Sequence, residues 1–134
     1  MTLEKTASGR VFGDVGLLLL RVCASAFMMT HGYPKLMKLL AGGEIQFMDF
    51  LGLGTQVSLA LAVVGEFVAP AFILVGLFTR WAAIPAAFTM AVAAFLAHAG
   101  DPFGDREMAL LYLTLFTTIG LLGPGRFSID AHRP

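Results

Sequence analysis

Six ionisable side chains lie within or beside the long apolar stretches of this sequence, where they could bind a ligand or move protons. These residues are Arg21, His31, Lys35, Glu66, His98 and Glu107. Two imidazoles and two carboxylates can exchange protons and hydrogen-bond a polar head group in a site that excludes water. A quinone ring needs hydrogen-bond donors for its carbonyl oxygens, a route for protons and an apolar slot. We therefore interpret the six residues as a candidate quinone site.

The members of this set have different expected roles. We assign Glu66 as the buried proton acceptor, and His31 and His98 as hydrogen-bond donors to the head group, so these three are the candidate catalytic residues. All six residues form the expected ligand-binding set. His and carboxylate ligands also suit a haem iron or a transition metal, which stays open as an alternative cofactor. No spacing in the sequence is typical of a metal site, and we assign no metal ligand.

Several of these residues also have a purely structural interpretation. Arg21 and Glu66 could form an ion pair that holds two helices in register. Glu107 could complement the dipole of a helix from its first turn, and Lys35 could reach the membrane interface as an anchor. However, an idle charge near the centre of a bilayer costs about 2.5–3.5 kcal/mol on insertion scales, so intramembrane charges are functional candidates by default.

The first long apolar stretch, residues 14–40, carries its ionisable groups on one helical face. The members of this face recur at spacings of three and four residues, which places them on one stripe of a helix. They are Asp14, Leu17, Arg21, Ala24, Met28, His31 and Lys35. Because a charged stripe avoids lipid, we expect it to face protein or water, with partners from the rest of the chain.

Composition places the chain among helical membrane proteins. Of its 134 residues, 57% are hydrophobic and only 13% are charged, and the mean hydropathy is +0.81. The length predicts one domain, residues 1–134. Net charge is zero and no basic run exists, so we expect a lipid bilayer and no nucleic acid as partner. Cys23 is the one cysteine, which excludes an intrachain disulfide and a Cys-based iron–sulfur site.

The hydrophobic pattern predicts an all-α fold, a bundle of four transmembrane helices with a short interfacial segment between the first two. The predicted spans are residues 14–34, 56–78, 81–99 and 106–122, preceded by a polar arm at 1–13 and followed by a tail at 123–134. Pro34 should kink or end the first helix, and Pro70 should bend the second at Glu66. Residues 44–54 are too short and too polar to span, and we expect an interfacial or re-entrant helix there.

Basic residues give an orientation for these spans. The two termini and the turn after the second helix carry Lys5, Arg10, Arg80, Arg126 and Arg133, whereas the opposite side carries Lys35, Lys38 and Arg106. This bias predicts that both termini are cytoplasmic. His31, His98 and Glu107 then lie at the outer helix ends, Glu66 near the membrane centre and Arg21 in the inner half. We expect all six site residues to form one polar column.

Several motifs resemble the DoxX family of bacterial membrane proteins. The residues that carry the resemblance are Leu20-Arg21-Val22, His31-Gly32-Tyr33-Pro34-Lys35-Leu36, Glu66, Gly76-Leu77-Phe78-Thr79-Arg80, His98, residues 106–113 and residues 123–130. The resemblance covers about residues 16–130. It implies a four-helix protein of the bacterial inner membrane. The family takes its name from a subunit of a thiosulfate:quinone oxidoreductase, and its relatives are linked with quinone and oxidative stress.

The leading hypothesis is therefore a quinone-interacting subunit of a membrane redox or oxidative-stress system. The chain has no nucleotide-binding glycine motif, so its electrons would come from a bound small molecule or from a redox partner protein. One alternative is a non-enzymatic membrane scaffold or chaperone subunit, in which the polar column only holds the bundle together. Another is a small-solute or proton transporter, which Glu66 would also suit. A small-residue helix face would allow a homo-oligomer.

Overall fold

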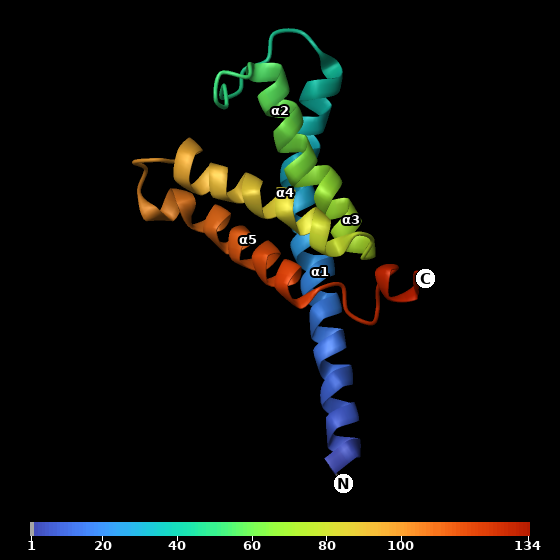
Figure 1. Cartoon of the computed structure of the whole chain (residues 1–134). Coiled ribbons are helices and arrows are strands. Elements are labelled where there is room, and N and C mark those ends of the chain that lie inside the picture. The colour runs from blue at the N-terminus through green and yellow to red at the C-terminus, as the bar shows by residue number, and fades with distance from the viewer. Residues whose placement is uncertain (1) are drawn as a thin grey trace.

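The computed structural model describes residues 2–134, with side chains from residue 6 onward, and this part of the chain is helical without strands. Figure 1 shows α1 as a long axis, a second helical rod beside its upper half, and a hairpin that leans away from both. The bounds are α1 Thr2–Ala41, α2 Thr55–Val63, the π turn η1 Val64–Val68, α3 Ala69–Val75, α4 Thr79–Val92, the π turn η2 Ala93–Ala97, α5 Phe103–Leu122 and the 3-10 turn η3 Asp130–His132.

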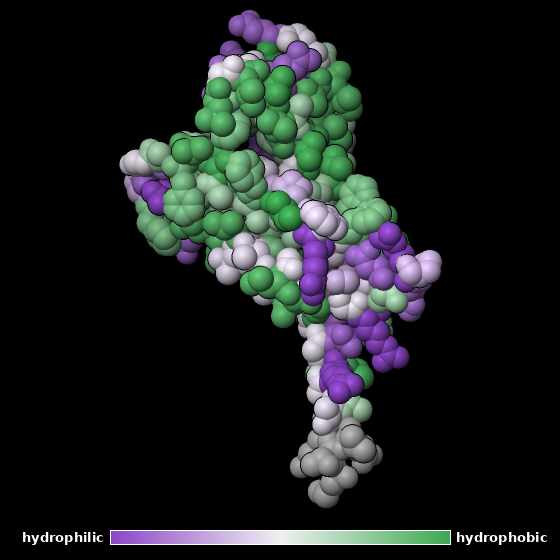
Figure 2. Space-filling model, in the orientation of Figure 1, coloured by the Kyte–Doolittle hydropathy of each residue, from purple (hydrophilic) through white to green (hydrophobic). Residues whose placement is uncertain are grey.

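Three segments are long and apolar enough to cross a membrane by length and composition. They are Thr6–Ala41, Thr55–Val75 and Thr79–Ala97. The fourth helix, α5, has 20 residues but carries acidic and basic residues in its first turns. On the face shown in Figure 2, apolar side chains cover most of the helical bundle, whereas polar ones gather toward its ends. The expectation of an all-α, polytopic membrane protein is confirmed.

The first helix is longer than predicted at both ends. It begins at Thr2, so the expected arm at residues 1–13 is helical from that residue, and it continues through Pro34 to Ala41. Of the two predicted effects of Pro34, an end of the helix is wrong, and a kink there stays a prediction. A proline inside a transmembrane helix is tolerated because neighbouring helices can compensate for the lost hydrogen bond. Here Gly32 brings the backbone of α1 directly against that of η1 just before Pro34.

The second span is one rod made of α2, η1 and α3, with its irregular turn at the expected place. Glu66 lies in the centre of η1, and Pro70 follows in the first turn of α3. Because Pro70 cannot donate a backbone hydrogen bond, the carbonyl of Glu66 loses its usual partner and the helix widens into a π turn. Such turns occur frequently at functional sites.

The segment between the first two spans is a loop, so the expected interfacial or re-entrant helix at residues 44–54 is wrong. Residues 42–54 form bends and turns without a helix. The hydroxyl of Ser58 accepts a hydrogen bond from the backbone N–H of Phe50 at 2.8 Å, and the Phe50 ring contacts Phe88 edge-on at a centroid distance of 6.4 Å. The loop therefore packs over α2 and α4, and its glycine-rich composition favours turns over a helix.

The buried centre lies where α1, α3, α4 and α5 meet. Its members are Ala24, Met28, Ala69, Ile73, Ala83, Ala86, Met90, Phe116 and Ile119. Alanines on α1, α3 and α4 allow close helix approach, which is how helices associate in lipid. The two helices of the α4–α5 hairpin touch at the small residues Ala83 and Gly120, where an added Cβ on Gly120 would lie 3.2 Å from that of Ala83.

Gly32→Ala should lower the free energy of unfolding by about 1–3 kcal/mol, because overpacking a close contact displaces backbone. An added Cβ at Gly32 would lie 2.9 Å from the backbone nitrogen of Phe67. The matched control is Gly13→Ala in the same helix, where an added Cβ meets nothing within 4 Å. Thermal unfolding in detergent should separate the two variants. Equal melting temperatures would contradict the close packing of α1 on η1.

Candidate ligand-binding site

The polar centre of the bundle is an ion pair between Lys35 of α1 and Glu66 of η1. The Glu66 side chain is only 7% exposed and that of Lys35 is 31% exposed. The pair lets a carboxylate remain inside an apolar bundle, because an unpaired charge there is costly. It also replaces the ion pair between Arg21 and Glu66 considered from the sequence.

Both members of the pair, together with His98, line a cavity that we call the histidine cavity. It has a volume of about 430 Å³. Its lining comprises Met28, His31, Pro34, Lys35, Glu66, Met90, Ala93, His98, Asp105, Met108, Ala109 and Tyr112. Four of the six residues predicted from the sequence therefore share one cavity, and they come from α1, η1 and the end of the α4 rod.

A second cavity, which we call the aromatic cavity, shares the Lys35–Glu66 pair and His98 with the first. It has a volume of about 290 Å³, and the loop side chains Phe47, Met48 and Phe50 form part of its lining. The ion pair therefore lies in a wall between a polar cavity and an apolar one. A flat, apolar molecule in either cavity could therefore contact the ion pair with one of its edges.

His98 is oriented by a neighbouring carboxylate. It terminates η2, and its Nδ1 lies 3.0 Å from Oδ2 of Asp101 in the α4–α5 turn. A carboxylate oxygen accepts hydrogen bonds, so this contact assigns the hydrogen to Nδ1 and leaves Nε2 outside the pair. Protonation of Nε2 turns the same ring into a donor. His98 can therefore pass a proton without leaving Asp101.

The residues that α5 contributes to the histidine cavity differ from the predicted one. Glu107 is exposed on α5 and belongs to neither cavity lining, whereas Asp105 and Tyr112 line the histidine cavity. Asp105 is also exposed, at the edge of the cavity, and a rotation of about 200° over two residues of helix turns Glu107 away from that edge. The spacing of seven between Asp105 and Tyr112 is a helical stripe and could have indicated the correct face. Tyr112 meets the His31 ring edge-on at 5.9 Å.

Arg21 lies toward the other end of the bundle, as predicted, but it bonds to backbone carbonyls there and does not join the other site residues in one polar column. It precedes Lys35 by fourteen residues, or about 21 Å along a helix. It is 1% exposed, and its guanidinium donates to the carbonyl oxygens of Ile73, Leu74, Pro124 and Phe127 at 2.8–3.1 Å. Carbonyls at the end of a helix have no partners within the helix, and a cation there complements its dipole.

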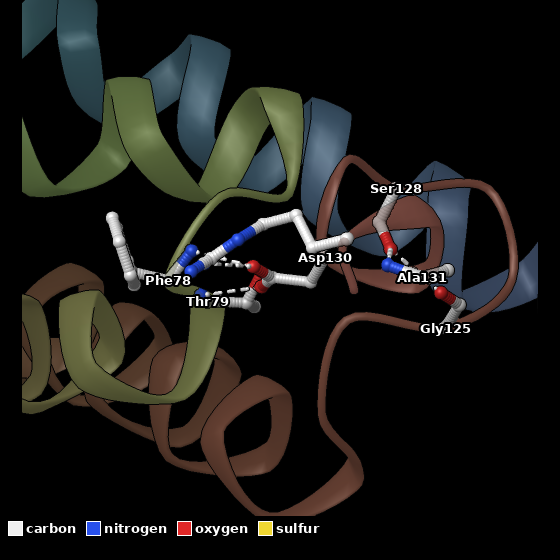
Figure 3. A network of polar contacts seen from close by, with 7 residues as sticks. Phe78, Thr79, Gly125, Ser128, Asp130 and Ala131 are labelled. Atoms are coloured by element: carbon white, nitrogen blue, oxygen red, sulfur yellow. Dashed lines mark hydrogen bonds and ion pairs between the residues drawn. The ribbon is translucent and has the colours of Figure 1, made fainter.

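The C-terminal segment is hydrogen-bonded to the rest of the bundle around Arg21. We call this region, formed by Arg21, residues 73–79 and residues 124–133, the C-terminal closure. Gly76 has φ 74°, and an added Cβ would lie 2.8 Å from Arg21 Nη2, so only glycine fits. The Asp130 carboxylate accepts hydrogen bonds from the backbone N–H groups of Phe78 and Thr79 at 2.8 and 2.9 Å (Figure 3). It thereby caps α4 from another segment.

Stability should fall at acidic pH through Asp130. Burial acts to raise the pKa of Asp130, but hydrogen bonds from Thr79, Phe78 and Arg133 outweigh it, so the pKa is lowered from its ordinary value. Folding thus favours the ionised form, and this stabilisation is present above the ordinary pKa of about 3.9 and lost as the pH falls below it.

The measurement is the apparent melting temperature between pH 6 and pH 3. Asp130→Asn should be less stable than the unmodified protein at pH 6 and should lose less stability on acidification. Glu44→Gln, in an exposed loop, is the control and should keep the full pH dependence. An Asp130→Asn profile parallel to that of the unmodified protein would contradict the capping role.

The cavity offers hydrogen-bond donors and acceptors but no compact ligand set for a metal. Among the side chains described, those of residues 6–134, no group of three or more His, Cys, Asp or Glu residues is arranged to hold a metal ion. The polar groups that line the cavity are one ammonium, two imidazoles, one phenol and two carboxylates, and they surround an apolar space. Such a set suits an organic molecule with oxygen atoms at its edges.

Comparison with known proteins gives one match. A family model described as DoxX matches residues 16–99, which is more than half of the chain. The matched segment contains Arg21 and eight of the twelve residues that line the histidine cavity, and it ends before α5. No curated protein and no solved structure matches the chain.

Proposed function

Because the chain belongs to the DoxX family of membrane proteins, we propose that it is a quinone-binding subunit of a redox system in the bacterial inner membrane. The observation that carries the proposal is the Lys35–Glu66 pair, which lies in the wall of a cavity that His31 and His98 also line. A pair needed only for packing would have no reason to face two cavities. We assign the quinone ring to the histidine cavity, because all four of these side chains meet there.

The cavity chemistry suits both redox forms of such a ring. A quinone carbonyl accepts hydrogen bonds, which Lys35 and a protonated His31 or His98 can donate. A quinol hydroxyl donates, and Glu66 can accept. The volume of about 430 Å³ falls within the roughly 300–1,000 Å³ of small-molecule sites. Three methionines in the lining adapt readily to a flat ring.

Proton movement is the step that these residues support best. Glu66 is the buried acceptor, and His98, held by Asp101, lies at the more exposed edge of the cavity. A ring that gains electrons from a partner protein would take its protons by this route. The distribution of basic residues favours both termini in the cytoplasm. In that orientation, His98 and the α4–α5 turn lie on the outer side of the membrane.

The test is the quinone content of protein purified in mild detergent, measured by mass spectrometry of a solvent extract. We expect close to one quinone per chain, and a decrease of at least tenfold in Glu66→Gln. Glu107→Gln makes the same change outside the cavity and should keep its quinone. Quinone that is absent, or equal in both variants, would contradict the proposal and favour a scaffold role. Proton flux into liposomes that depends on Glu66 without quinone would favour a transporter.

A further inference from the structure

A long apolar groove lies between α1 and α5, below the histidine cavity along α1. Its volume is about 590 Å³. Its α1 wall extends from Gly16 to Phe27 and its α5 wall from Met108 to Leu115. The lining is apolar apart from the weakly polar groups of Cys23 and Tyr112. The candidate site described above does not account for this groove.

The walls of the groove are continuous helical stripes that face lipid. The α1 members recur at spacings of three, four or one residue over eleven residues, or about 16 Å of helix. The rims are exposed, with Leu19 at 64%, Phe27 at 59% and Leu111 at 58%. The groove is therefore open along its length to a hydrocarbon chain.

The groove adjoins the histidine cavity. Met108 and Tyr112 line both of them. Tyr112 contacts the His31 ring on the cavity side and lies beside α1 on the groove side. A molecule with its polar end at Lys35–Glu66 would pass Tyr112 and then extend along apolar side chains of the groove.

We propose that the groove between α1 and α5 holds the isoprenoid tail of a lipid-soluble quinone whose ring lies in the histidine cavity. This inference rests on the proposed function and adds that the ligand is a long-tailed quinone. The polar-to-apolar continuity favours one molecule with a head and a tail. A helix from a second copy is about 10–12 Å wide with its side chains and has no reason to align with the cavity.

Cys23 provides a reporter, because it is the one cysteine of the sequence and lines the groove. The experiment measures its alkylation by N-ethylmaleimide in lipid nanodiscs. The probes are a ubiquinone with a long isoprenoid tail and the tail-less tetramethylbenzoquinone. Both rings are fully substituted, so neither adds a thiol at a free ring carbon. Their concentrations are expressed per lipid molecule, and binding of each is quantified separately by mass spectrometry.

We expect the long-tailed quinone to slow the alkylation of Cys23 at least fivefold and the tail-less quinone to leave it unchanged. The control is Cys23→Ser/Ile84→Cys, which moves the thiol to an exposed position of α4 outside the groove and should show no protection. Leu111→Trp fills the groove from its exposed rim. It should weaken binding of the long-tailed quinone at least tenfold without affecting the tail-less one, whereas Ile84→Trp should affect neither.

Two results would overturn the inference and leave the proposed function intact. One is binding of both quinones at the histidine cavity with no protection of Cys23. The other is a Cys23 thiol alkylated much more slowly than the Ile84→Cys thiol in quinone-free nanodiscs, which would show that a phospholipid chain or a second copy already fills the groove. Failure of both quinones to bind would instead overturn the proposed function itself, and this inference with it.

Discussion

Replacing Arg21 by methionine should lower the free energy of unfolding by about 3–5 kcal/mol. The change removes the donors of four hydrogen bonds to carbonyl oxygens of α3 and the C-terminal segment. A buried polar group left without a partner costs about 1–3 kcal/mol, and losses above about 4 kcal/mol are exceptional for one substitution. The measurement is thermal unfolding in detergent, where we expect the melting temperature to fall by roughly 10 °C or more.

Two further variants make this result specific. Arg10→Met removes an exposed arginine from the same helix and should leave the melting temperature unchanged. Arg21→Lys keeps the charge but has one nitrogen in place of the guanidinium fork, so it should recover only part of the stability. Its quinone content should equal that of the unmodified protein, because Arg21 lies far from the cavity. An Arg21→Met protein as stable as Arg10→Met would contradict the C-terminal closure.

Lys35→Met should lower the free energy of unfolding by about 2–4 kcal/mol, and a second substitution at Glu66 should restore most of it. The single change leaves a carboxylate that is 7% exposed without its cation, and breaking a buried pair in this way is strongly destabilising. Replacing both members by apolar residues of similar volume is often neutral or stabilising. The measurement is a double-mutant cycle of Lys35→Met, Glu66→Met and the double variant.

The cycle should give a coupling free energy of about 2 kcal/mol or more, as expected for residues in direct contact. Lys35→Met/Glu66→Met should then be at least as stable as either single variant. Additive losses from the two single variants would show that the two side chains act independently, and would contradict the ion pair.

The sequence predicted the elements better than their ends. Hydrophobic runs and the period of the charged stripe on α1 were sufficient for the helices, and Pro70 predicted the irregular turn at Glu66. The sequence did not decide whether α1 ends at Pro34 or continues through it, because a proline has the same local effect whether or not packing compensates for it. The loop at 42–54 was misassigned because its apolar residues cover a cavity instead of facing lipid.

The sequence predicted which residues belong to the candidate site better than it predicted which of them meet. His31, Lys35, Glu66 and His98 were selected because polar side chains in apolar helices are costly, and this argument holds whatever the fold. It says nothing of which polar groups meet. Arg21 shares a helix face with Lys35, yet its partners are determined by the end of α3, about fifty residues away, and by the C-terminal segment, more than a hundred residues away.

Quinone binding by Lys35→Met/Glu66→Met tests the central claim most directly. This variant keeps the apolar volume of the bundle but removes the polar wall between the two cavities. The account predicts a stable protein whose quinone content, measured by mass spectrometry from nanodiscs, falls at least tenfold below that of the unmodified chain. A stable double variant that still carries quinone at the original stoichiometry would contradict the claim, and the Lys35–Glu66 pair would then be a packing contact.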